Sequence, residues 1–247
     1  MRPPGGLGFD RPPRTAQAEG VRWRRVAGAL TLAVSLAPAG VVASPASAAT
    51  PLLALGSRGP AVVTLQRHLA GLGYWLGPVT GVVNDATQQA VFAIQKAAGL
   101  SRDGIVGPLT QGAIARGVRP KPHSTRGAVV EINLSTNLLL LVRDGRLVAT
   151  LNVSTGGGYP YSMNGVSGVA VTPRGQFRVF RQVNGLDVSP LGEMWRPKYF
   201  SGGFAIHGSA FVPPQPASHG CVRVSNAAMD WIWASNRMPI GTLVWIY

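Results

Sequence analysis

The spacing of apolar side chains changes part-way along the chain. Between residues 51 and 118, apolar positions recur at the spacing of an α-helix, and glycine or proline interrupts each run. Asn84 or Asp85 can cap the second run, and Pro108 suits the first turn of a third. This pattern predicts a small all-α module of three helices.

From Gly127 onward the period falls to two, which is typical of strands with one buried face. The Asp144-Gly145 pair predicts a tight hairpin between two of these strands. The strands expected from the pattern span residues 129–134, 138–142, 147–153, 176–180, 204–206 and 242–247, and a short helix is expected over 226–234. Residues 127–247 therefore form a second domain that is mostly β, so the protein is multidomain.

Residues 119–126, RPKPHSTR, lie between these two regions. They are basic and carry two prolines, which predicts a stiffened linker. With 247 residues, 46% of them hydrophobic, the chain can build a core on each side of this linker.

The first 48 residues have the composition of a signal peptide. A basic stretch at 22–25 precedes an apolar run at 26–42 and a small-residue segment that ends at Ala48. The alternative is a membrane anchor, but Pro38 makes the run a poor membrane span. The sequence therefore predicts cleavage after Ala48, a secreted or cell-wall location, and no stable membrane span afterwards.

Positive charge dominates, with 23 Lys and Arg against 9 Asp and Glu, a net charge of +14. The region after residue 48 keeps 17 basic against 7 acidic residues. A basic surface suits an anionic partner. Because no basic cluster is interleaved with aromatic residues, nucleic acid is not expected, and an anionic cell-wall polymer fits better.

The chemistry concentrates in residues 203–224, which hold His207, His219 and the only cysteine, Cys221. A thiol attacks as the thiolate, and histidine is its usual base. Gly220 carries no Cβ, so a substrate carbonyl can approach and the amides of Gly220 and Cys221 can face an oxyanion. A single cysteine outside the cell cannot form an internal disulfide. Two alternatives remain open: a buried structural cysteine, and a metal site made from the two histidines and the thiol.

The order of these residues resembles the signature of the L,D-transpeptidase catalytic domain, the YkuD family. The matching residues are His207-Gly208 and, downstream, SHGCVR at 218–223. The resemblance implies that Cys221 is the nucleophile, that His207 is the base, and that the carbonyl of Gly208 orients the His207 ring. It also implies a mostly β fold built on a sandwich or mixed sheet, with no metal and no cofactor.

Further roles follow from the same resemblance. Ser218 and His219 are expected to shape the pocket, and Arg223 is expected to lie near the carboxylate of the substrate. Residues 187–200 are read as a lid-like wall of the cleft. The substrate-contacting residues expected in that wall are Met194, Trp195 and Tyr199, with Phe211 helping to limit water entry. Packing alone would explain these aromatic side chains equally well.

The helical region resembles the peptidoglycan-binding domain of the PGBD-1 type. The matching positions are Leu65-Gln66, Leu69, Gly73-Tyr74, Gly81, Thr87, Ala90-Val91, Gln95 and Asp103-Gly104-Ile105-Val106-Gly107. The alternative is a helical bundle without a ligand. Because the module contributes no catalytic group, removing residues 52–118 is expected to leave the turnover of small substrates largely intact and to weaken binding to whole sacculi.

These observations predict an exported cysteine L,D-transpeptidase that acts on peptidoglycan, binding both stem peptides and glycan. Three alternatives remain. An L,D-carboxypeptidase would resolve the same thioester with water, a wall-binding protein would have lost catalysis, and a metalloenzyme would use the histidines as ligands.

Overall fold

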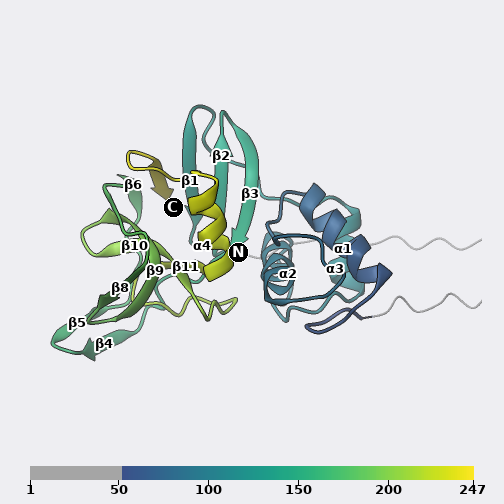
Figure 1. Ribbon diagram of the computed structural model, residues 1–247, viewed down its shortest axis with the longest axis horizontal. Helices are drawn as coiled ribbons and strands as arrows, with labels where there is room; N and C mark the ends of the chain where they lie inside the picture. The colour runs from purple at the N-terminus through teal and green to yellow at the C-terminus, as the bar shows by residue number, and fades with distance from the viewer. Residues whose placement is uncertain (1–51) are drawn as a thin grey trace, which may run out of the picture. The chain divides into compact units, whose positions relative to one another are not determined.

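Three helices make up the first part of the chain that the structure describes (Figure 1). The computed structural model describes residues 52–247, so the predicted signal peptide and its cleavage site lie outside the described residues. The helices are α1 (Pro60–Gly71), α2 (Asp85–Ala97) and α3 (Pro108–Ala115). No helix within residues 52–247 is long and apolar enough to cross a bilayer.

The termini of these helices follow the expected signals. Proline stands in the first turn of α1 and of α3. Asn84 caps α2, because its side chain accepts a hydrogen bond from the Thr87 amide at 2.9 Å. Gln66 and Gln95 are fully buried, and their side-chain amides bind the backbone of the loops that follow. These two positions therefore hold the module together.

The β region begins with a five-stranded sheet in the order β3-β2-β1-β12-β6. Its strands are β1 (Ala128–Asn133), β2 (Leu138–Arg143), β3 (Arg146–Asn152), β6 (Gly175–Arg178) and β12 (Leu243–Ile246). β1 and β12 run parallel and every other pair in this sheet is antiparallel, so the sheet is mixed.

The second sheet has the order β11-β10-β9-β7, and β8 also pairs with β9. Its strands are β7 (Arg181–Gln182), β8 (Leu186–Ser189), β9 (Gly192–Ser201), β10 (Phe204–Ser209) and β11 (Val222–Ser225). β10 and β11 are parallel. A separate hairpin consists of β4 (Pro160–Met163) and β5 (Val166–Val169).

Helix α4 (Asn226–Ala234) contributes to the core shared by both sheets (Figure 1). Its Met229 and Ile232 are fully buried in one cluster with Ile132 of β1 and Ile206 of β10. Burying large aliphatic side chains contributes about 1.5–3 kcal/mol each. This core fixes β10, which carries His207, and β11, which directly follows Cys221.

Strand β2 is buried on both faces, which explains its unbroken run of leucines. Leu139 and Leu141 belong to the core with α4. Leu138, Leu140 and Val142 belong instead to the core of the three helices. A sheet covered on both sides shows a continuous apolar run rather than an alternating one, so the helical module is part of what covers this sheet.

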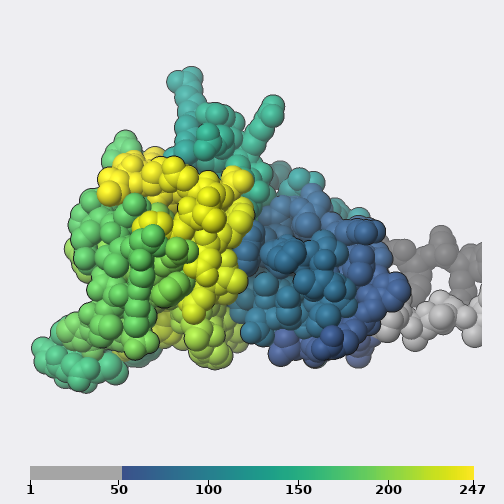
Figure 2. All heavy atoms as spheres, in the orientation of Figure 1, coloured from purple at the N-terminus to yellow at the C-terminus, as the bar shows by residue number. Residues whose placement is uncertain are grey.

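The helical module also pairs with the edge of the sheet through its backbone. The Trp75 amide donates to the Thr150 carbonyl at 3.0 Å, and the Thr150 amide donates to the Gly73 carbonyl at 2.7 Å. The Trp75 ring lies 5.7 Å from the Trp231 ring of α4. Figure 2 shows the atoms of the module in direct contact with those of the C-terminal region.

A buried lysine completes this interface. Lys96 of α2 donates from Nζ to the carbonyls of Asn137 and Val153, each at 2.9 Å. Burial, with a smaller effect of Arg102, lowers the pKa of Lys96 to about 6. A neutral amine has two N–H groups, which match the two carbonyls without burying a charge.

The predicted linker is also held in place. The backbone amides of His123 and Ser124 both donate to the carboxylate of Glu131, which is fully buried in β1. The His123 ring stacks on Tyr247 at 4.3 Å between ring centroids. These contacts fix the segment that joins the module to β1.

Candidate active site

A cleft of about 350 Å³ lies against β10 and the start of β11. One part of its wall comes from the β8–β9 turn, residues 189–194, and another from the β4–β5 hairpin through Tyr161 and Val166. The residues of the signature that line it are His207, Ser218, His219, Cys221 and Arg223. The structure therefore brings together the side chains that the sequence placed in one stretch.

Cys221 lies at the entrance to β11 with its sulfur against β10. The Ala205 amide donates to Sγ at 3.5 Å, and Sγ lies 3.8 Å from the Gly203 carbonyl. Burial raises the pKa of the Cys221 thiol above its usual range. The resting group at neutral pH is therefore the thiol rather than the thiolate.

His207 is 4% exposed and lies in β10. Its Nδ1 is 2.8 Å from the carbonyl of Gly208. Because a carbonyl can only accept, Nδ1 carries the proton and Nε2 keeps a free electron pair. Burial lowers the pKa of His207 to about 4, so the ring is neutral at pH 7 and can accept a proton. Within the described residues, the thiol bonds to Gly203 and Ala205 and not to this ring.

The turn before the cysteine is held by side chains. The Ser218 hydroxyl donates to the Cys221 carbonyl at 2.6 Å and accepts from the Gly220 amide at 3.0 Å. Thr172 donates to the Gly220 carbonyl at 2.7 Å. At Gly220, where φ is 138°, a Cβ would lie 2.4 Å from the Phe204 ring, so only glycine fits.

The hydrogen bond from the Gly220 amide to Ser218 changes the expected set of amides that face the oxyanion. The Gly220 amide already donates to Ser218, so it is not directed at a substrate. Of the two amides predicted to face an oxyanion, that leaves the Cys221 amide as the candidate.

Two outer residues complete the cleft. His219 is packed edge-on by Tyr159 and Tyr161, with ring centroids 5.7 and 4.9 Å away. Arg223 pairs in register with His207 across the parallel strands, and Nη1 donates to the Ala217 carbonyl at 3.4 Å. Its positive charge is one of the smaller influences that lower the pKa of both His207 and Cys221.

Comparison with known proteins fits this geometry. A family described as the L,D-transpeptidase catalytic domain matches residues 127–246, and one described as a putative peptidoglycan binding domain matches 58–114. The crystal structure of the L,D-transpeptidase from Xylanimonas cellulosilytica is 54% identical, covers 81% of this chain and 98% of its own, and has a TM-score of 0.78. The chain belongs to the L,D-transpeptidase family.

One curated relative matches over a shorter length. The N-acetylmuramoyl-L-alanine amidase CwlL from Bacillus licheniformis is 39% identical over 79 residues, which is 31% of this chain. The match spans 22% of the length of that amidase. The predicted family and the multidomain fold, a helical module followed by a mostly β domain, are both confirmed.

The residues expected to contact substrate separate into two groups in this member of the family. Met194 lines the cleft. Trp195 and Tyr199 are absent from its lining: the Trp195 indole donates to Asp230 at 2.7 Å, and the Tyr199 hydroxyl donates to Asp187 at 2.7 Å. These two side chains support the wall from behind.

Phe211 is also placed elsewhere. It is 71% exposed and lines a groove of about 600 Å³ that runs between α2 and residues 209–215. It therefore does not limit water entry at the cleft.

Sequence reasoning missed the β4–β5 hairpin, whose Tyr161 forms part of the cleft. These strands are largely exposed and pair only with each other, so they show no alternating apolar signal. The two aromatic residues near the GGG segment, Tyr159 and Tyr161, were the available signal.

The alternative metal site is not formed. Among residues 52–247, no three His, Cys, Asp or Glu side chains are grouped so that they could hold an ion. His207, His219 and Cys221 share the cleft without forming such a group.

Proposed function

We propose that this chain is an exported cysteine L,D-transpeptidase that cross-links peptidoglycan stem peptides through a thioester on Cys221. The observation that carries the proposal is the arrangement of His207. Its Nδ1 is fixed on a carbonyl, its Nε2 is free, and it opens onto the same cleft as the thiol. Family membership favours the same chemistry.

The first half-reaction forms the acyl-enzyme. The Cys221 thiol gives its proton to Nε2 of His207 as Sγ attacks the stem-peptide carbonyl. The oxyanion faces the Cys221 amide. When the C–N bond breaks, His207 returns the proton to the leaving D-amino acid and the acyl group remains on Sγ. Arg223, at the cleft, is placed to attract the carboxylate of the substrate.

The second half-reaction releases the product. An amine of a neighbouring stem attacks the thioester carbonyl, and His207 accepts the proton that the amine loses. The C–S bond then breaks, and Sγ recovers the proton from His207. If water takes the place of the amine, the same steps give the L,D-carboxypeptidase reaction.

Product mass distinguishes transfer from hydrolysis. Given a disaccharide-tetrapeptide, the mature protein is expected to yield a dimer lighter than two donors by one D-alanine. Mass spectrometry reads this product directly. Tripeptide monomer alone, with acceptor in excess, would support the carboxypeptidase. The absence of any product would support a non-catalytic wall-binding protein.

A chelator separates thiol catalysis from the metalloenzyme alternative. Thiol catalysis predicts the same dimer yield with and without the chelator, and a metalloenzyme predicts a lower yield with it.

Export gives a second prediction. The mature chain is expected to begin near Ala49 or Thr50, because the small-residue segment ends at Ala48. N-terminal sequencing of protein recovered from the culture medium or wall fraction tests this. A secreted chain that starts at Met1 would contradict cleavage, and retention of the arginines at 22–25 in a membrane fraction would favour the anchor.

A further inference from the structure

Strand β9 carries one residue more than its partner β10 beside the catalytic histidine. Ile206 pairs with Lys198, but Gly208 pairs with Trp195, so two steps on β10 match three on β9. Such a bulge re-aims the groups around it. Within it, Arg196 has φ of 51°, a left-handed conformation that is strained for a non-glycine residue. The surrounding structure must therefore hold it.

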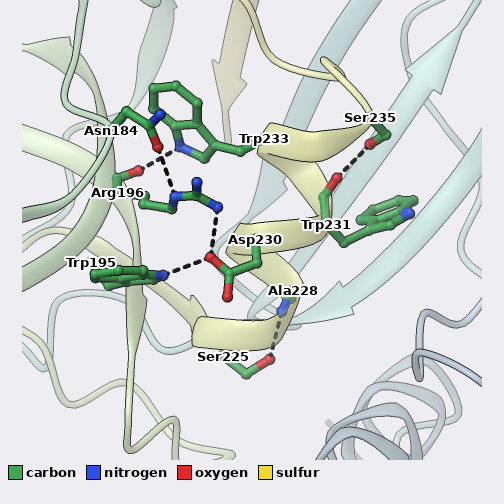
Figure 3. A network of polar contacts seen from close by, with 9 residues as sticks. All are labelled: Asn184, Trp195, Arg196, Ser225, Ala228, Asp230, Trp231, Trp233 and Ser235. Atoms are coloured by element: carbon green, nitrogen blue, oxygen red, sulfur yellow. Dashed lines mark hydrogen bonds and ion pairs between the residues drawn. The ribbon is translucent and has the colours of Figure 1, made fainter.

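Four polar contacts hold Arg196, and Figure 3 shows the side chains involved. Nη1 forms an ion pair with Asp230 of α4 at 2.9 Å, and Nε donates to Asn184 at 2.9 Å. The Arg196 carbonyl accepts from the Trp233 indole at 2.9 Å, and its amide donates to the Gly185 carbonyl at 2.8 Å. Both the side chain and the backbone of the bulge residue are thus fixed.

The bulge places Trp195 directly against Gly208. The Trp195 indole donates at 2.7 Å to the same Asp230 oxygen that binds Arg196 (Figure 3). A Cβ on Gly208 would lie 2.9 Å from the Trp195 ring and 2.7 Å from the Asn226 side-chain oxygen. The backbone of Gly208 is therefore confined from two sides.

Gly208 is the residue whose carbonyl binds Nδ1 of His207. That bond lies where the pairing between β10 and β9 is irregular. We infer that Arg196, Asp230 and Trp195 are positioning residues for the His207 base: by fixing the β9 bulge they hold the Gly208 carbonyl on Nδ1 and keep Nε2 free. This inference rests on the proposed function, because it concerns the base of that reaction.

A purely structural ion pair is the competing explanation. The Asp230 side chain is 47% exposed, and ion pairs that are exposed to solvent contribute little to stability. A role limited to stability would therefore leave turnover unchanged well below the melting temperature. A positioning role would lower kcat, because misplacing the base weakens proton transfer, and would leave KM largely unchanged.

The test compares Asp230→Ala with Asp230→Asn. The alanine variant loses the acceptor of both Trp195 and Arg196, and its kcat is expected to fall about tenfold while KM stays within about twofold. Asparagine keeps an oxygen at the same position, so its kcat is expected to stay within about twofold of the parent. Trp231→Phe is the matched control, because this ring on α4 packs on Trp75 and is not one of the partners that hold Arg196.

Nitrogen-15 NMR of the His207 ring gives a readout that does not depend on turnover. The parent and Asp230→Asn are expected to show the Nδ1–H tautomer, and Asp230→Ala a mixture with Nε2–H. An unchanged kcat in Asp230→Ala would overturn the inference. It would also be overturned if Asp230→Ala, Asp230→Asn and Trp231→Phe lost kcat equally, in step with their melting temperatures. Full turnover by His207→Ala would instead overturn the proposed function, while the tautomer would still report on the bulge.

Discussion

Replacing Cys221 with alanine is expected to reduce acyl transfer on the order of 10⁴-fold or more, because the proposed nucleophile is lost. The side chain is partly buried and accepts only one weak bond, from the Ala205 amide. The fold should therefore be retained. The measurement is dimer formation from a disaccharide-tetrapeptide, with thermal unfolding as the check on folding. Cys221→Ser is the closest control in size, and it too should be inactive because a hydroxyl is far harder to deprotonate.

The histidines are expected to rank below the cysteine in a defined order. His207→Ala removes the proposed base and should lower turnover by about 10²–10⁴-fold. His219→Ala should lose less, because this ring packs on Tyr161 at the rim of the cleft and makes no contact with the Gly208 carbonyl. The base assignment fails if His219→Ala is as inactive as Cys221→Ala while His207→Ala remains active.

Deleting residues 52–118 is expected to destabilise the catalytic domain severely. The sequence predicted that small-substrate turnover would survive this deletion, but the structure changes that expectation. The deletion exposes Leu138, Leu140 and Val142 on the sheet, at about 1.5–3 kcal/mol each. Domain stabilities are only about 5–15 kcal/mol. The truncated chain should therefore be insoluble or melt well below the full chain, and equal melting temperatures and turnover would contradict this.

Lys96 permits a milder version of the same test. Lys96→Ala leaves the carbonyls of Asn137 and Val153 without their buried donor, at about 1–3 kcal/mol each. Arg67→Ala is the control, because this exposed residue of α1 lies on the same module. Thermal unfolding should separate the two variants. If both melt like the parent, the buried amine does not hold the interface.

The local signals in the sequence predicted the regular elements well. The β1–β3 meander followed from its short apolar segments and from Asp144-Gly145, and the helix limits followed from Asn84 and Pro108. The packing of the helical module against the β domain was not predicted. The run at Leu138 read as a strand with one buried face, because nothing local indicates that distant helices cover its other face.

The site was predicted in part for the same reason. Cys221 and His207 could be placed in one cleft because both belong to one short stretch, His207 in β10 and Cys221 directly before the neighbouring β11. The position of Trp195 depends on a bulge in β9. The register of β9 against β10 is set by the pairing of two strands, so it cannot be read from the local sequence of either one. A one-residue change of register turns a side chain to the other face of the sheet. Trp195 was therefore read as a cleft residue.

The attachment of the helical module to the sheet has a consequence for which walls this enzyme can work on. A flexible tether would let the catalytic cleft sample many distances from the point where the module binds. Here the backbone pairing at Thr150 and the buried Lys96 hold the distance between the module and the cleft at a single value. Two sites joined in this way reinforce each other only where the spacing of their targets matches, and the benefit vanishes where it does not. The enzyme should thus select places in the wall by the separation between an anchoring strand and a reactive stem, as well as by the chemistry of either one.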